Sequence, residues 1–368
     1  MQINSLYNLS TRIVKRNKDF RLAKRKIVSK HKKKNKNKRT LYVPKEVVKA
    51  RNEFHRKFNG YKRICVPNNF SLINNPNGVL EAIEKIHNAF ECRKPIFVDL
   101  KHVQEITMDA LVLLLSHVTQ FKSHNIRFNG SRPDNMKIEQ IIEASRFYEI
   151  TSRSRIPKQY IGDSEFSYNR PSFFTHAKKN VDSELTANII AEFSKEIWGE
   201  KKRCQGVQRI FIELMQNTNN HANKISGDEY WWLSAVHRKD TNTICFSFID
   251  YGMGIFNSLN SKKLGEKFFG WVEAISAKCN PLNHYEVLEQ MLLGNFHRTV
   301  TGKYYRGKGL PGIYEQIGKG GISKLVIISN DAYADASVSK YYKLQTPLMG
   351  TFVYFEIDKT CKNLPYIE

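Results

Sequence analysis

The chain has 368 residues, of which 41% are hydrophobic and 12% aromatic, a composition typical of globular proteins with room for two ordinary domains. No apolar run is long enough to span a bilayer and the N-terminus has no apolar signal-peptide core, so the composition excludes an integral membrane or secreted protein. The six cysteines are scattered and form no Cys-x-x-Cys pair, which favours free thiols in a cytoplasmic protein over disulfides or zinc ligands.

The net charge of +24 is concentrated at the N-terminus. Residues 1–63 contain 22 Lys and Arg against 3 Asp and Glu, a net +19, which leaves +5 for the remaining residues. We therefore interpret residues 1–59 as a basic arm, partly disordered, attached to a nearly neutral body. Residues 12–39 predict contact with the phosphates of a nucleic acid, while the alternative is a solvated tail that aids solubility.

Strand-like and helical patterns alternate between residues 60 and 151. Strands are predicted at 63–66, 95–100 and 126–130, and helices at 78–90, 108–121 and 135–147. The apolar residues of the first helix, Val79, Ile83, Ile86 and Phe90, fall on one helical face. This alternation predicts a small α/β domain.

Residues 98–111, with the sequence VDLKHVQEITMDAL, resemble the STAS domains of sulfate transporters and anti-sigma-factor antagonists. The resemblance implies an interaction module rather than a catalyst. Asp109 occupies the position of the serine that is phosphorylated in the antagonists, where its carboxylate would imitate a permanent negative charge. Thr107 is expected to cap the following helix rather than to accept phosphate.

Residues 152–182 read as a linker, because they are rich in Pro, Ser and Asn. The pattern changes at Ser183, where two amphipathic helices follow. The second helix carries Glu213, Asn217 and His221, spaced by four residues and therefore on one face. A carboxylate there can activate a water near a terminal phosphate, and an amide oxygen suits Mg²⁺. The alternative is an ordinary solvated polar face.

Strands are predicted at 230–236 and 243–249, and the second runs directly into Asp250, Gly252 and Gly254. A carboxylate at the end of a strand can accept a hydrogen bond from the exocyclic amine of adenine, and the glycines allow close approach of the backbone. By itself, an Asp-x-Gly-x-Gly sequence also fits a simple tight turn.

A second glycine-rich stretch, at residues 306–313, precedes a predicted helix. Arg306 and Lys308 supply positive charge there. Gly307 and Gly309, followed by Leu310, leave backbone N–H groups accessible at the N-terminus of the helix. Glycines at a helix N-terminus favour anion binding. Two further strands are predicted at 324–329 and 351–357, with Thr351 opening the last one.

The order of these motifs resembles the GHKL (Bergerat-fold) ATPases and kinases over residues 183–358. The resemblance implies an α/β (α+β) sandwich in which a mixed sheet carries helices on one face. It also implies Mg·ATP as the ligand, a catalytic base at Glu213, a magnesium ligand at Asn217 and a contact near the nucleotide at His221. Asp250 and Thr351 would bind adenine, the four glycines would form two nucleotide-binding boxes, and the residues between the boxes would form a lid.

Three functions compete on this evidence. The first is an ATP-hydrolysing regulatory switch that controls a protein or nucleic-acid partner, and we prefer it because Glu213 and Asn217 are both present. The second is a serine/threonine kinase of the anti-sigma type, and the third is a non-catalytic ATP-binding adaptor. A homodimer without membrane association is expected, and by analogy the architecture suggests a regulatory or defence protein.

Overall fold

The computed structural model describes residues 47, 49, 53–54, 56–145, 147–152, 172–178, 181–221, 230–252, 254–256, 283–295, 309–362 and 364–365. The chain separates into two compact units, residues 1–59 and 60–368, and the second contains all the elements discussed below. The predicted basic segment at 12–39 lies outside the described residues.

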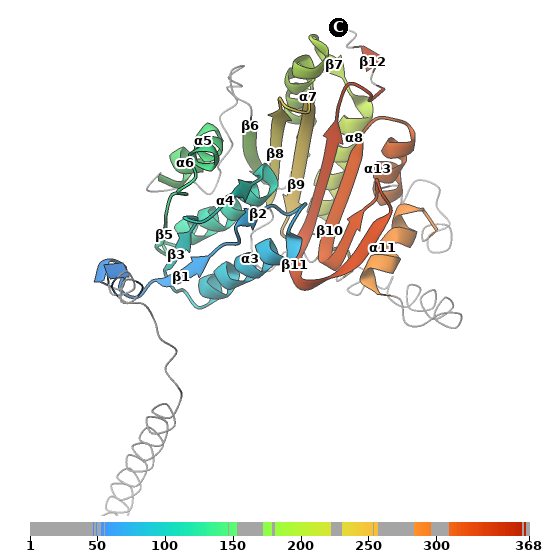
Figure 1. Ribbon diagram of the computed structural model, residues 1–368. Coiled ribbons are helices and arrows are strands. Elements are labelled where there is room, and N and C mark those ends of the chain that lie inside the picture. The colour runs from blue at the N-terminus through green and yellow to red at the C-terminus, as the bar shows by residue number, and fades with distance from the viewer. Residues whose placement is uncertain are drawn as a thin grey trace, which may run out of the picture. The chain divides into compact units, whose positions relative to one another are not determined.

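The first part of the second unit has the predicted alternation of strands and helices (Figure 1). Its elements are β1 (Lys62–Cys65), β2 (Asn69–Phe70), α3 (Pro76–Glu91), β3 (Ile96–Asp99), β4 (Glu105–Ile106), α4 (Met108–Ser123), β5 (Phe128–Gly130), α5 (Met136–Ala144) and α6 (Phe147–Ser152). Strands β1, β3 and β5 form a parallel sheet in that order. Helix α3 begins where Asn75 accepts a hydrogen bond from the Gly78 N–H and Pro76 supplies the first turn.

The second part is built on a five-stranded sheet in the order β10-β11-β9-β8-β6. Its elements are β6 (Ser172–Lys178), α7 (Ser183–Trp198), β7 (Lys202–Arg203), α8 (Gln205–His221), β8 (Tyr230–Arg238), β9 (Thr243–Asp250), α11 (His284–Leu292), α13 (Gly309–Gly318), β10 (Lys324–Asp335), β11 (Lys340–Ile357) and β12 (Leu364–Pro365). The prediction of a mixed sheet is wrong for the described strands, which pair antiparallel throughout. The reason is that β8 and β9 follow one another directly in the chain, as do β10 and β11. Consecutive strands joined by a short connection pair antiparallel.

Both faces of this sheet are buried. Phe246 and Phe248 pack with α7, α8, α11 and α13, whereas Cys245 and Ile249 pack with α3 and α4. The expectation of helices on one face therefore holds only for the helices that follow residue 182. The other face is covered by the preceding α/β segment, so strands that look fully apolar in sequence are buried on two sides.

Residues 172–178, which the sequence placed in the linker, form β6 and pair with β8. The composition around them is that of a loop, but their backbone groups satisfy the open edge of β8. The pairing partner, rather than the local composition, determines the structure of this segment.

The opposite edge of the sheet is protected by a fold-back within β10. Asn330 has φ 50°, and the Ala336 N–H donates to the Leu325 carbonyl at 2.9 Å. The second half of β10 therefore lies beside its own first half, and the final edge is the short β11 segment that begins at Lys340. Lysines at such an edge oppose strand-to-strand aggregation.

The α/β fold class is confirmed by these sheets and their covering helices. Helix α4 is nearly enclosed, with Leu111, Leu113 and Leu115 inaccessible to solvent. Within the part of the chain that the structure describes, no helix has both the length and the apolar character needed to cross a bilayer.

Candidate nucleotide site

Helix α8 presents its polar side chains beside a buried apolar stripe. Val207, Phe211 and Met215 are inaccessible and pack under the five-stranded sheet, whereas Glu213 and Asn217 are half-buried. The four-residue spacing places these two side chains one turn apart on the same face. The helix therefore has the polar face that the sequence predicted.

Helix α13 lies antiparallel against α8, and glycines permit the close approach. A methyl group added to Gly309 would lie 3.5 Å from both Glu213 Oε2 and Asn217 Nδ2, and one added to Gly312 would lie 3.6 Å from Arg209 Nη2. The first residue of α13 is therefore in contact distance of the Glu213–Asn217 pair. Two segments nearly 100 residues apart in sequence meet at this point.

Asp250 ends β9 at the centre of a polar row that crosses four strands. In register, Trp231 lies beside Asp250, Asp250 beside Thr351, and Thr351 beside Ser329. The Thr351 hydroxyl donates to the Asp250 carboxyl, and the hydroxyls of Ser329 and Thr351 are 3.2 Å apart. Since side chains alternate along each strand, this row projects from the face on which Phe246 and Phe248 meet α8. The row and the polar face of α8 therefore belong to the same side of the sheet.

The turn after Asp250 is held against β10. The Gly252 N–H donates to Asp250 Oδ1 at 2.9 Å, and the Ile255 N–H donates to Ser329 Oγ at 2.9 Å. Gly254 has φ +76°, and a methyl group there would come within 2.4 Å of Asn330 Oδ1. Gly254 thus permits a close approach of the turn to Asn330, and the predicted approach of these glycines to a base stays a prediction.

Ser329 and Asn330 are site residues that sequence reasoning missed. Ser329 supports both Thr351 and the turn after Asp250, and Asn330 accepts a hydrogen bond from the Phe256 N–H at 3.3 Å. The available signal was only the predicted end of a strand at residue 329. Their role depends on the register of β10 with β11, which local sequence does not specify.

The environment of Asp250 changes its ionisation. Burial raises the pKa of its carboxyl from 3.8 to about 6, although the hydrogen bonds from Gly252 and Thr351 favour the ionised form. Part of Asp250 remains accessible. A partly accessible carboxyl with a raised pKa is typical of a ligand-binding or catalytic position.

Tyr251 points to the other face of the sheet and contacts α4. Its hydroxyl is hydrogen-bonded to Ser116 Oγ, and its ring packs edge-on against His117 with centroids 5.6 Å apart. Burial lowers the pKa of His117 to about 4, so the imidazole is neutral at physiological pH and bonds to the Leu113 carbonyl. The turn that carries Asp250 is therefore anchored directly on the preceding α/β segment.

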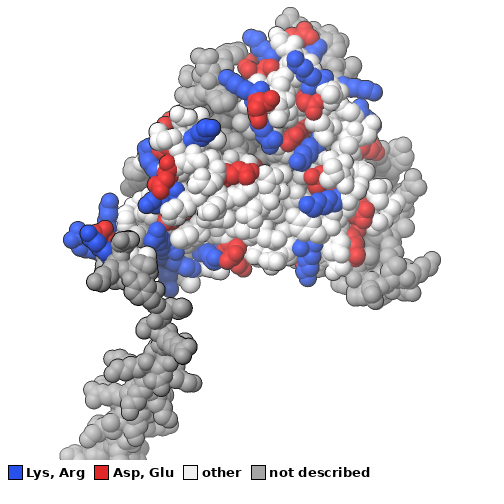
Figure 2. Space-filling model, in the orientation of Figure 1, with Lys and Arg blue, Asp and Glu red and all other residues white. Residues whose placement is uncertain are grey.

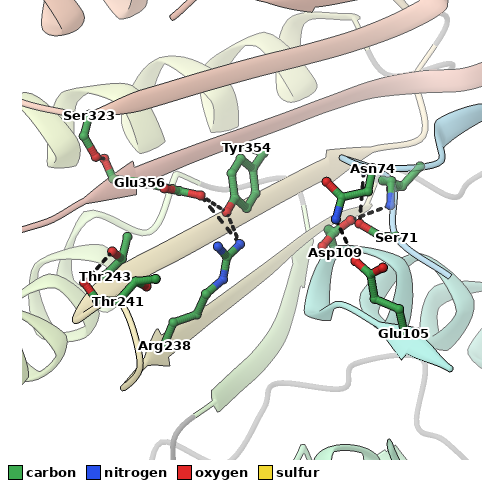
Figure 3. Close-up of polar contacts among 11 residues, drawn as sticks. Ser71, Asn74, Glu105, Asp109, Arg238, Thr241, Thr243, Ser323, Tyr354 and Glu356 are labelled. Carbon is green, nitrogen blue, oxygen red and sulfur yellow. Dashed lines mark hydrogen bonds and ion pairs between the residues drawn. The ribbon is translucent and has the colours of Figure 1, made fainter. Parts of the chain in front are cut away.

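Asp109 does not present a negative charge at the surface, contrary to the expectation drawn from its position. Its side chain is 3% exposed at the start of α4, and it accepts a hydrogen bond from the Leu72 N–H at 2.8 Å (Figure 3). Burial raises the pKa of its carboxyl, so the site favours the neutral form. Asp109 therefore ties the loop before α3 to α4. Arg238 on β8 does not neutralise it through a hydrogen bond in the described structure, because its guanidinium donates to the Tyr354 hydroxyl.

Some predicted site residues fall outside the described residues, namely Arg306, Gly307, Lys308 and the side chain of His221. Leu310 is half-buried and packs against the core beneath α13. Among the described residues, no cluster of three or more His, Cys, Asp or Glu side chains could hold a metal ion. Mg²⁺ that is carried by a nucleotide needs only one or two protein oxygens, and the amide oxygen of Asn217 could supply one.

Comparison of the chain with protein-family models, curated protein sequences and solved structures found no match.

Proposed function

We propose that the chain binds Mg·ATP between α8, the turn after Asp250 and the start of α13, and that it acts as an ATP-hydrolysing regulatory switch. The observation that carries the proposal is the position of Gly309, where an added methyl group would lie 3.5 Å from both Glu213 and Asn217. A helix N-terminus favours phosphate, and here it meets a carboxylate and an amide suited to water activation and magnesium. The GHKL-like order of the motifs supports the same assignment.

In this proposal each residue has a separate task. Asp250 accepts a hydrogen bond from the adenine amine, and Thr351, whose hydroxyl lies 3.2 Å from that of Ser329, holds the Asp250 carboxyl in place. Asn217 contributes an oxygen to the magnesium ion, which neutralises phosphate charge when bound. Glu213 orients the attacking water and takes its proton as the oxygen bonds to phosphorus. The phosphate transferred to water leaves ADP behind.

The proposal extends to partners and location. The contact of Tyr251 with Ser116 provides a route by which ATP occupancy alters the STAS-like α/β segment, the surface on which we place a protein partner. We place nucleic-acid contact on residues 12–39, a homodimer as the assembly and the cytoplasm as the location. The five cysteines described are free thiols, as expected in a reducing compartment.

Asp250→Asn is expected to weaken ATP binding about 10- to 100-fold, because a hydrogen bond to a charged group contributes about 1.5–3 kcal/mol. Calorimetric titration of the purified protein with ATP and MgCl₂ measures the loss. Asp240→Asn, in the exposed turn between β8 and β9, is the matched control and should bind like the wild type. Equal affinity of Asp250→Asn and the wild type would remove the adenine assignment.

The affinity for adenosine is expected to rise with pH between 5 and 7. The ligand requires the ionised carboxyl of Asp250, whose pKa is about 6, so at pH 5 only about a tenth of it is ionised and affinity falls about tenfold. Adenosine is the probe because a terminal phosphate also titrates near pH 6. The folding stability changes with pH in the opposite direction. Because the pKa of the Asp250 carboxyl is raised in the folded state, the protonated carboxyl stabilises the fold below pH 4, and this contribution is lost as pH rises through 6. A flat affinity profile contradicts this role.

The switch and kinase alternatives are separated by the fate of the phosphate. After incubation with γ-labelled ATP, hydrolysis releases label into solution, whereas a kinase transfers it to protein. Label on this chain or on an added partner would replace the hydrolytic proposal with the kinase.

A further inference from the structure

The amino ends of the parallel strands carry a cluster of basic side chains. Lys62 begins β1, Lys94 lies two residues before β3, and Arg127 immediately precedes β5. The Lys62 N–H donates to the Pro95 carbonyl at 2.9 Å, and the Ile96 N–H donates to the Arg127 carbonyl at 3.2 Å. These bonds place the three strand starts side by side at one edge of the sheet (Figure 1).

The side chains at this edge are accessible. Lys62, Arg93, Lys94 and Arg127 are all exposed, and the Arg127 guanidinium carbon lies 5.2 Å from the centroid of the Tyr61 ring. Residues 92–95 and 124–127, the loops that lead into β3 and β5, contain no Asp or Glu, and Glu91 at the end of α3 lies 3.9 Å from His87. Elsewhere on the visible face, positive and negative side chains are interspersed (Figure 2). The edge therefore has a local excess of positive charge.

We propose that this basic edge, formed by Tyr61, Lys62, Arg93, Lys94 and Arg127, binds a single-stranded nucleic acid. Lysine and arginine neutralise backbone phosphates, and the Tyr61–Arg127 stack provides a surface for a base. In sequence only Gly60 separates the basic arm of residues 1–59 from Tyr61, so the arm is adjacent along the chain to the first residues of this edge. The proposal deepens the nucleic-acid part of the proposed function and is independent of the nucleotide pocket.

A nucleic acid fits this edge better than a membrane does. Membrane-surface segments combine basic residues with exposed apolar side chains. The large exposed apolar side chains of the described residues after position 60 are Met136, Ile141, Leu293, Val338 and Met349, and none belongs to the edge. Tyr61 is aromatic and half-buried, which suits stacking better than insertion into lipid.

The test uses the full chain with labelled 20-nucleotide RNA and DNA single strands, titrated by fluorescence anisotropy over a series of salt concentrations. Lys94→Gln/Arg127→Gln should weaken binding about tenfold near 100 mM salt. It should also reduce the slope of log affinity against log salt by about 1.4, since each phosphate contact with a single strand contributes about 0.7. Lys359→Gln/Lys362→Gln removes the same charge from an exposed segment after β11 and serves as the control.

Tyr61→Ala adds a second readout, since loss of base stacking should reduce affinity about 5- to 100-fold while leaving the salt slope unchanged. The proposal is overturned if the edge and control variants lose the same affinity, or if neither loses any. It is also overturned if the wild type binds vesicles containing phosphatidylserine but no single strand. A preference for RNA over DNA, or the reverse, identifies which strand is bound and supports the edge in either case. ATP affinity of the edge variant should equal that of the wild type, so failure here is separable from failure of the pocket.

Discussion

Glu213→Ala is expected to retain ATP binding and to lose turnover, with the rate constant for phosphate release reduced about 10²- to 10⁴-fold, the usual contribution of a positioned general base. Glu213 lies beside Gly309 at the N-terminus of α13, where we propose that a phosphate is held, and it does not belong to the polar row that contains Asp250. Its removal should therefore affect the reaction far more than affinity. Phosphate release under saturating ATP gives the rate, and calorimetry gives the affinity.

Gln216→Ala is the matched control for this experiment. Gln216 lies on the same helix and is exposed, so truncating it tests the general effect of shortening a polar side chain on α8. It should leave both rate and affinity within about twofold of the wild type. If Glu213→Ala hydrolyses ATP as fast as the wild type, Glu213 is not the base. If it loses binding as well, the carboxylate supports the pocket rather than the reaction.

Gly350→Ala is expected to destabilise the fold by about 3 kcal/mol or more. Gly350 has φ +109°, a conformation that an alanine adopts only with strain, and an added methyl group would lie 1.9 Å from the Asp250 carbonyl oxygen. Neither backbone can move without breaking the pairing of β9 with β11, because Thr351 is registered opposite Asp250. Urea unfolding followed by circular dichroism measures the change.

Gly318→Ala provides the comparison for Gly350→Ala. Gly318 ends α13 with an ordinary φ, and a methyl group there would meet no atom within 4 Å. Alanine at this position should leave stability unchanged or raise it by less than about 1 kcal/mol. Equal stabilities for the two variants would show that β9 and β11 approach less closely than described. A selective loss in Gly350→Ala should also weaken ATP binding, since the same contact positions Asp250.

Local sequence was sufficient for features that depend on spacing along one element. The four-residue interval of Glu213 and Asn217 places them on one helical face whatever surrounds the helix. The apolar run of β9 ends at Asp250, and the following glycines mark a close backbone approach, which Gly254 makes against Asn330. The alternating pattern of residues 60–151 likewise predicted a small α/β domain, and its strands β1, β3 and β5 are parallel because helices cross over between them.

Tertiary structure alone decided which of these elements meet. Residues 172–178 are a strand because β8 offers them an open edge, and Ser329 reaches Thr351 because of the β10–β11 register. Asp109 is buried because α4 packs on the second face of the sheet, although its sequence position suggested an exposed charge. The physical reason is the same in all three cases. The periodic pattern of a sequence indicates only which face of its own helix or strand a side chain occupies. Pairing partners, strand register and burial depend on segments distant in the chain.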